Sequence, residues 1–217
     1  MKAILFDFDG TLANTLPICF DAFQHVFRKF DQKELTSEDI KAMFGPSETG
    51  IISANLINQN IEEAIEHYYE KYSESHKSLV VPNHEITNLL NYLKDKGIKL
   101  GIVTGKARRS LDISLEALQM NDLFDVIITG DDVIQPKPHP EGVIKALAFL
   151  EVGPHEAMFI GDSDADIQAG VQANVFTVGV QWLPDYQTLE FSIEPHSVYY
   201  SVIDFKNSLG FGERNEL

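Results

Sequence analysis

Five short, mostly apolar segments alternate along this chain with longer amphipathic stretches, and this alternation limits the fold more than any other feature of the sequence. The apolar segments are Ala3–Phe6, Ile98–Val103, Val126–Ile128, Ala157–Ile160 and Phe176–Val180. Short apolar runs are typical of strands buried on both faces, and amphipathic stretches are typical of the helices that cover them. The sequence therefore predicts an α/β fold with a doubly wound parallel sheet.

Polar or glycine-containing sequence directly follows each of the first four apolar segments. These polar clusters are Asp7–Thr11, Thr104–Lys106, Thr129–Asp132 and Gly161–Asp164. Ligands of open parallel sheets bind at the carboxyl ends of the strands. We therefore expect the four clusters to converge on one crevice.

The first and second apolar segments are separated by about ninety residues, far more than the roughly 30 residues of a simple βαβ unit. Apolar residues recur at helical spacing throughout this interval. We predict an inserted all-helical cap domain at residues 15–81 and an α/β core domain formed by residues 1–14 and 82–217. The segment from Phe205 to Leu217 is predicted to be a short helix with a frayed polar end.

The charge of the chain limits the kinds of partner it can bind. Its 17 Lys and Arg residues stand against 33 Asp and Glu residues, a formal net charge of -16. Nucleic acids and anionic membranes attract cationic side chains, so this balance argues against both partners. Cys19 is the lone cysteine, so the chain cannot form an intrachain disulfide. Asp7 and Asp9 interrupt the first apolar run, so the N-terminus does not match the pattern of a signal peptide. We expect a cytoplasmic protein with a small-molecule partner; the sequence leaves the oligomeric state open.

Two groups of carboxylates follow predicted strands and indicate a metal site. Asp7 and Asp9 lie two residues apart after the first strand, and Asp162, Asp164 and Asp166 follow the fourth. Carboxylates that are held close together repel each other, so they take part in acid/base chemistry, bind a cation, or do both. An oxygen-only donor set favours Mg²⁺ over zinc.

A lysine and a threonine-glycine pair predict an anion site beside these carboxylates. Lys137 lies between prolines, which restrict the backbone around it. Thr104 and the backbone amides of Gly105 and Lys106 precede a predicted helix, and the N-terminus of a helix binds phosphate groups. Phosphoryl transfer needs little beyond such positioning and charge neutralisation.

Four sets of residues, taken in order, resemble the four motifs of the haloacid-dehalogenase-like hydrolase superfamily. They are Asp7–Leu12, Thr104, Lys137 and Gly161–Asp166. The helical insertion is similar to the C1 cap of that superfamily. Val103–Lys106 and Lys137–Pro140 are most similar to its phosphoglycolate phosphatase and pyrophosphatase branch. The resemblance implies a Rossmann-like core with a C1 helical cap.

This resemblance also implies roles for individual carboxylates. Asp7 is implied to be the nucleophile that forms an aspartyl-phosphate. Asp9 is implied to protonate the leaving oxygen and then to deprotonate the attacking water. Asp166 is the implied partner that orients Lys137 or a water on the metal.

The ligand-holding residues follow from the same resemblance. Those implied to hold the phosphoryl oxygens of the substrate are Thr104, Gly105 and Lys137. Those implied to hold Mg²⁺ are the carboxylate of Asp7, the main-chain carbonyl of Asp9 and Asp162.

Together these features predict a Mg²⁺-dependent phosphatase for a small phosphorylated metabolite, with phosphoglycolate as the first candidate substrate. The alternatives are an inorganic pyrophosphatase and a phosphotransferase of the β-phosphoglucomutase type. A receiver-like domain and a phosphometabolite-binding protein without catalysis are more remote alternatives. The sequence leaves open whether Arg108, Arg109 or the cap loop Gly45–Ser47 contacts the substrate.

Overall fold

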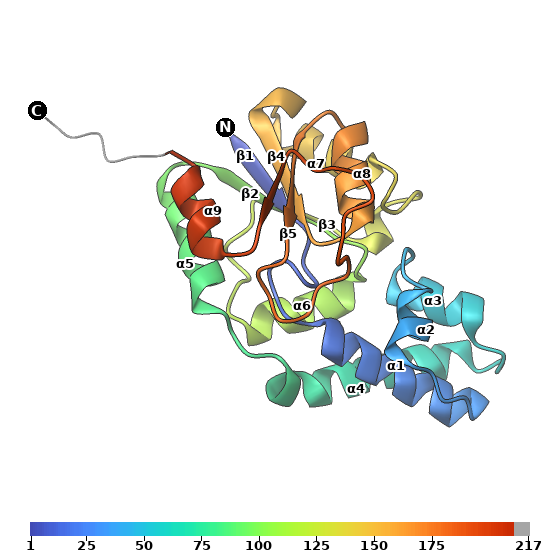
Figure 1. Ribbon diagram of the computed structural model, residues 1–217. Coiled ribbons are helices and arrows are strands. Elements are labelled where there is room, and N and C mark those ends of the chain that lie inside the picture. The colour runs from blue at the N-terminus through green and yellow to red at the C-terminus, as the bar shows by residue number, and fades with distance from the viewer. Residues whose placement is uncertain (211–217) are drawn as a thin grey trace, which may run out of the picture.

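The computed structural model describes residues 1–210 and contains a six-stranded sheet (Figure 1). The strand order is β3-β2-β1-β4-β5-β6, and every neighbouring pair is parallel. The strands are β1 (Ala3–Phe6), β2 (Lys99–Val103), β3 (Val126–Ile128), β4 (Ala157–Gly161), β5 (Phe176–Val180) and β6 (Ser197–Tyr199). The predicted parallel sheet is confirmed, and its first five strands agree with the apolar segments to within one residue at each end.

The edge strand β6 has no counterpart among the predicted strands. Its three residues are partly or fully exposed, so it lacks the apolar run that marks a strand buried on both faces. It pairs with β5 in parallel register, with Ser197 opposite Val178. Tertiary pairing at the sheet edge defines this strand, and a local pattern does not reveal it.

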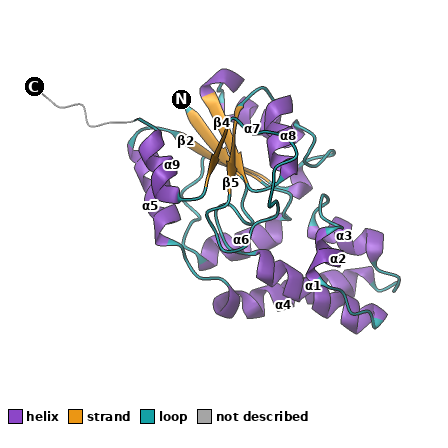
Figure 2. Cartoon of the chain, in the orientation of Figure 1, coloured by secondary structure: helices purple, strands orange, loops and turns teal. Residues whose placement is uncertain are grey.

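Helices cover both faces of the sheet. The core helices are α5 (His84–Asp95), α6 (Arg108–Ala117), α7 (Glu141–Leu150), α8 (Asp164–Gln172) and α9 (Val202–Ser208), with 3₁₀ turns at Gly130–Asp132 and Pro154–Glu156. α7 and α8 lie on one face, and α5 and α9 lie on the other (Figure 2). Along β1, Ala3 and Leu5 join the cluster under α7 and α8, whereas Ile4 and Phe6 join the opposite cluster. The doubly wound arrangement is therefore confirmed.

The last helix begins slightly earlier than the sequence indicates. α9 starts at Val202, three residues before Phe205, because Ser201 caps it by accepting a hydrogen bond from the Asp204 amide at 3.3 Å. The polar end that is predicted to fray, around Glu213–Asn215, lies outside the described residues.

Four helices between β1 and α5 form a lobe beside the core (Figure 1). They are α1 (Leu16–Asp31), α2 (Ser37–Lys41), α3 (Glu48–Asn55) and α4 (Ile61–Leu79). The two long helices, α1 and α4, pack against each other, and the ring centroids of Phe23 and Tyr68 are 4.6 Å apart. The inserted segment is all-helical, as its apolar spacing indicates; the domain limits at residues 14/15 and 81/82 stay a prediction.

The lobe rests on α6, the core helix that follows β2. The hydroxyl of Tyr72 in α4 is 2.7 Å from that of Ser114 in α6, and Nε2 of His76 is 3.0 Å from the same oxygen. All three side chains are buried. This contact places the helical lobe over the carboxyl edge of the sheet.

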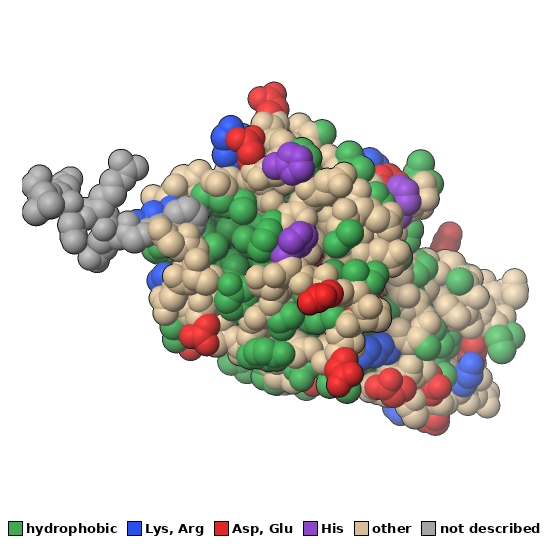
Figure 3. Space-filling model, turned by 45° about the horizontal axis from the view of Figure 1, so that its top comes forward, with side chains coloured by type: hydrophobic (Ala, Val, Ile, Leu, Met, Phe, Trp, Pro, Cys, Tyr) green, Lys and Arg blue, Asp and Glu red, His purple; other side chains and the backbone are tan. Residues whose placement is uncertain are grey.

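The surface of the protein carries mixed charges. On the face shown in Figure 3, Lys and Arg side chains are scattered among acidic ones and do not gather in one patch. Within residues 1–210, no helix combines the length and the apolar character needed to cross a membrane.

Candidate active site

A cavity of about 390 Å³ lies between the carboxyl edge of the sheet and the helical lobe. Its core side includes Asp7, Asp9, Thr104 and Lys137, and its other side is formed by residues of α1, α2, α3 and the loop before α3. Three of the four polar clusters that were expected to converge therefore do so. The fourth, Thr129–Asp132, does not line the cavity.

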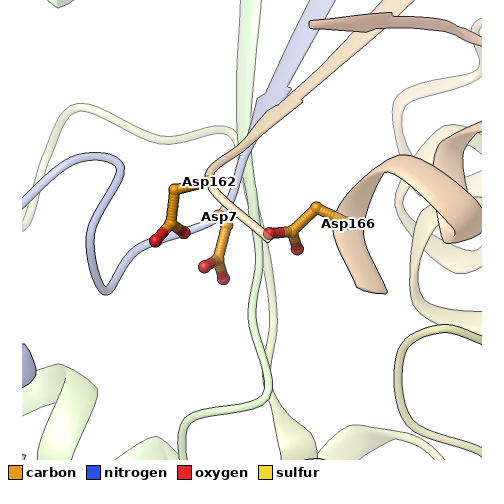
Figure 4. A group of neighbouring side chains, drawn as sticks. All are labelled: Asp7, Asp162 and Asp166. Carbon is orange, nitrogen blue, oxygen red and sulfur yellow. The ribbon is translucent and has the colours of Figure 1, made fainter. Parts of the chain in front are cut away.

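Three buried aspartates meet at the core side of this cavity. A carboxylate oxygen from each of Asp7, Asp162 and Asp166 lies within 4.8 Å of one from each of the others. Figure 4 shows the carboxylate of Asp7 between the other two in that view. Asp7 follows β1, Asp162 follows β4, and Asp166 lies in the first turn of α8. The parallel sheet thus brings together side chains that are more than 150 residues apart in sequence.

Two hydrogen bonds and one glycine fix the carboxylate of Asp162. Its oxygens accept from the hydroxyl of Thr11 at 3.3 Å and from the backbone N–H of Gln187 at 2.6 Å. Gly10 has a φ of +80°, and a Cβ there would collide with this carboxylate. Burial, together with the nearby Asp166 and Asp7, raises the pKa of Asp162 well above its usual range. Glycine is therefore required at position 10 both by conformation and by space.

Asp166 holds Lys137 while capping its own helix. One carboxylate oxygen of Asp166 accepts from the N–H and hydroxyl of Ser163 at 3.0 and 2.6 Å, which completes a capping box at the start of α8. The other oxygen is 2.5 Å from Nζ of Lys137. Both oxygens are engaged, so Asp166 has a fixed orientation toward the lysine.

Lys137 joins two of the three aspartates. Its ammonium is 2.7 Å from Asp7 and 2.5 Å from Asp166. Burial lowers the pKa of Lys137, but the two carboxylates more than offset this effect and raise it overall. Burial raises the pKa of Asp7 to about 7; Lys137 opposes that rise, and Asp166 and Asp9 add to it. The lysine is thus charged, and the aspartates still repel each other.

The aspartate group fits a divalent cation with oxygen ligands. If all three aspartates are ionised, the one ammonium leaves two negative charges uncompensated in a buried site, and this repulsion contributes to the raised pKa of Asp7 and Asp162. Burying unpaired charge is costly. An ion such as Mg²⁺, which prefers carboxylate and carbonyl oxygens, would remove that cost. The donor chemistry and the charge of the site both match it.

Asp9 faces a second group of polar side chains, nearer the cap. Its carboxylate accepts from the hydroxyl of Thr15 at 2.5 Å and lies 3.1 Å from Nζ of Lys106. The sulfur of Cys19 lies 3.4 Å from the same ammonium. Lys106 also lies over the ring of Tyr72, 4.4 Å from its centroid. The sequence indicated a role only for the backbone amide of Lys106, because no local pattern marks its side chain as buried.

Glu48 connects the cap to the core. Its carboxylate, at the start of α3, accepts from the backbone N–H of Ala107 at 2.5 Å and from the hydroxyl of Ser110, and lies 3.5 Å from Nζ of Lys106. Burial raises its pKa, although Lys106 and these hydrogen bonds oppose the rise. No local sequence signal marks Glu48, because its partners come from a different domain.

The segment predicted to cradle an anion is arranged differently from the expectation. Thr104 and Gly105 line the cavity, as predicted. However, α6 begins at Arg108, and the Lys106 amide donates to the hydroxyl of Thr104 at 3.2 Å. The carboxylate of Glu48 binds the first turn of α6. The backbone amide of Lys106 is therefore already satisfied, and the helix N-terminus faces the cap.

The structure shows the contacts of the two arginines and the position of the cap loop, which the sequence left open. Arg108 pairs with Asp132 at 2.7 Å, and Arg109 pairs with Glu66 at 2.6 Å. Neither arginine lines the cavity, whereas Gly45 and Pro46 of the cap loop do.

Comparison with known proteins identifies the family. The model of the haloacid dehalogenase-like hydrolases matches residues 4–180 of this chain. The chain belongs to this family. In this hydrolase, the four sets of residues that resemble the family's motifs lie around one cavity. Pyrophosphatase PpaX of Anoxybacillus flavithermus is 34% identical over 214 residues, 99% of each chain. The Bacillus cereus protein of that name is 36% identical over 182 residues, 84% of each chain.

Solved structures share the fold of this hydrolase. CbbY from Rhodobacter sphaeroides, solved in complex with phosphate, matches with a TM-score of 0.82 at 24% identity, over 94% of this chain and 96% of that one. A predicted phosphoglycolate phosphatase from Haemophilus somnus matches with a TM-score of 0.82 at 20% identity, over 96% and 98%. The α/β core with its helical cap is therefore the fold of haloacid dehalogenase-like hydrolases.

Proposed function

We propose that this hydrolase is a Mg²⁺-dependent phosphatase that acts on a small phosphorylated metabolite through an aspartyl-phosphate on Asp7. The proposal rests on one observation: three aspartates, Asp7, Asp162 and Asp166, lie close together, and Lys137 pairs with two of them. These side chains supply a nucleophile, a divalent-ion site and a cation for phosphoryl oxygens, which phosphoryl transfer requires. The phosphatase names of the relatives support the same reaction.

Two displacements at phosphorus account for the reaction. First, a carboxylate oxygen of Asp7 attacks phosphorus, the bond from phosphorus to the leaving oxygen breaks, and protonated Asp9 gives its proton to that oxygen. Second, Asp9 takes a proton from a water molecule whose oxygen attacks phosphorus, and the bond to Asp7 breaks. Phosphate leaves, and Asp9 is protonated again. Thr104, Gly105 and Lys137 hold the phosphoryl oxygens.

The proposed metal ligands are the carboxylates of Asp7 and Asp162 and the main-chain carbonyl of Asp9. When bound, Mg²⁺ supplies positive charge that neutralises these carboxylates and the phosphoryl oxygens. Asp166 has both oxygens occupied by Lys137 and Ser163. This supports a positioning role for Asp166, with the lysine as the group it orients.

Two substrates suit a cavity of about 390 Å³. The motifs resemble a branch that includes both phosphoglycolate phosphatases and pyrophosphatases, with phosphoglycolate as the first candidate, whereas relatives that are 34–36% identical and named pyrophosphatase favour inorganic pyrophosphate. Isomerisation of a hexose phosphate would instead indicate the alternative of a β-phosphoglucomutase-type phosphotransferase.

A turnover screen with Mg²⁺ tests the proposal. The substrates are p-nitrophenyl phosphate, phosphoglycolate, pyrophosphate and a hexose phosphate, and the readouts are phosphate release and sugar isomerisation. We expect phosphate release, fastest with phosphoglycolate or pyrophosphate. Release from none of the four would reject catalysis and leave a binding protein. Isomerisation faster than phosphate release would assign a mutase.

Lys106→Met should reduce phosphate release by about 10²-fold, because Lys106 holds Asp9 and general acid/base catalysis contributes about 10²- to 10⁴-fold. p-Nitrophenolate leaves readily without a proton, so its initial burst should persist while the steady-state rate falls. Stopped-flow absorbance measures both phases. A variant that loses burst and steady state equally would contradict this role, and circular dichroism would show whether it is folded.

A further inference from the structure

Three lysines line the cavity, and two of them are already paired. Lys137 bridges Asp7 and Asp166, and Lys106 contacts Asp9 and lies 3.5 Å from Glu48. The third, Lys41, is the last residue of the cap helix α2. Its ammonium makes no hydrogen bond or ion pair with any residue in the described part of the chain. Lys41 is therefore the uncompensated cation of this cavity.

The rest of the cap lining offers nothing to balance this charge. Phe44, Gly45 and Pro46, which follow Lys41, carry no charge, and Glu48 is the other charged cap residue among the lining residues. Glu48 is committed to Lys106, Ala107 and Ser110 of the core. The cap side of the cavity thus presents one free positive charge.

The helix that carries Lys41 is anchored at both ends. At its start, Thr36 and Asp39 form a capping box, with the Asp39 amide donating to the Thr36 hydroxyl at 3.1 Å. Ile40, the residue before Lys41, is fully buried. The backbone at Lys41 is therefore held in place while its long side chain keeps its freedom to reach a ligand.

We propose that Lys41 binds a second anionic group of the substrate, so that the cap selects small phosphates with a carboxylate or another phosphate a few bonds from the transferred phosphoryl group. This inference rests on the proposed function. The transferred group lies at the core side of the cavity, beside Asp7 and Lys137, so the remainder of the substrate extends toward the cap. An anion there meets a free ammonium, whereas a neutral group leaves Lys41 unpaired.

Matched substrate pairs test this inference. Phosphoglycolate is compared with 2-hydroxyethyl phosphate, and pyrophosphate with methyl phosphate, because only the first member of each pair carries a second anionic group. The quantity compared is the ratio of the variant's kcat/KM to that of the unaltered protein on each substrate, so intrinsic differences in leaving group cancel. Lys41→Gln should reduce kcat/KM for the two doubly anionic substrates by about 10- to 100-fold, the effect of losing a charged hydrogen bond. For the two neutral-ended substrates the change should stay below about threefold. Lys41→Arg should recover most of the loss.

Lys77→Gln is the matched control, because Lys77 is an exposed lysine of the cap helix α4 and does not line the cavity. It should leave all four substrates unchanged. An equal loss on both members of each pair, or no loss on either, would overturn the role of Lys41. Hydrolysis of no substrate by the unaltered protein would instead reject the proposed function.

A binding measurement separates these outcomes further. In the Asp7→Asn background, calorimetry with Mg²⁺ should show that Lys41→Gln weakens phosphoglycolate binding by about 10-fold or more and leaves 2-hydroxyethyl phosphate nearly unaffected. Equal affinities for phosphoglycolate with and without Lys41 would overturn the inference whether or not turnover is detected.

Discussion

Asp7→Asn should lower the rate of phosphate release by roughly 10⁴-fold or more, since removing an enzyme nucleophile abolishes its covalent step. The neutral amide cannot displace a leaving group from phosphorus, and no second carboxylate occupies its place at the end of β1. Asp162 is held by Thr11 and Gln187, and Asp166 by Ser163 and Lys137. Phosphate release measured on a single-turnover timescale checks the expected loss.

The same substitution should leave the metal-free protein at least as stable as before. Asp7 is buried beside Asp162 and Asp166, and its raised pKa reports the cost of its charge there. An uncharged side chain of the same size removes that cost, while Lys137 keeps its contact with Asp166. Thermal unfolding in the presence of a chelator measures this. A strongly lowered melting temperature would mean that loss of activity reflects loss of structure.

Removal of divalent ions should abolish turnover, and Mg²⁺ should restore it. With the ion absent, the raised pKa of Asp7 makes its nucleophilic carboxylate less available, and the negative charge that remains on the aspartates repels an approaching phosphate dianion. Asp162→Asn removes one proposed ligand, so the Mg²⁺ concentration for half-maximal activity should rise by about 10- to 100-fold or more. A titration of activity with Mg²⁺, started from chelator-treated protein, measures the shift.

Asp164→Asn is the matched control for that titration. Asp164 lies two residues from Asp162, but its carboxylate accepts from the N–H and hydroxyl of Ser192 at 2.8 and 2.7 Å. It is outside the group of three aspartates. For Asp164→Asn, the Mg²⁺ concentration for half-maximal activity should change by less than about threefold. Full activity in chelator, or equal shifts for the two variants, would contradict the assignment of Asp162.

The core of the site was predictable because it depends on rules that act along the sequence. An apolar run followed by a polar cluster marks the carboxyl end of a parallel strand, and such ends share one edge of the sheet. Asp7, Thr104 and Asp162 are therefore brought to one crevice by the order of strands alone. The contact of Asp166 with Lys137 followed from the resemblance to a family, and the structure contains it.

What the sequence did not reveal depends on how the cap packs on the core. Glu48 and Lys106 lie 3.5 Å apart although one belongs to α3 and the other precedes α6. Their pairing requires the cap to be placed first. Likewise, Glu48 binds the first turn of α6, and Lys41 becomes a cation of the cavity only because the packing of α2 places it there. Such relations between domains leave no period or spacing in the sequence.

The central claim is that Asp7 itself receives the phosphoryl group, and chemical trapping tests it most directly. The protein is mixed with Mg²⁺ and substrate, quenched within the first turnover, and treated with borohydride, which reduces an acyl phosphate to an alcohol. Peptide mass spectrometry then locates the reduced residue. The structure predicts homoserine in place of Asp7 and none in Asp7→Asn. Rapid turnover with position 7 unmodified, or reduction at another aspartate, would contradict the mechanism.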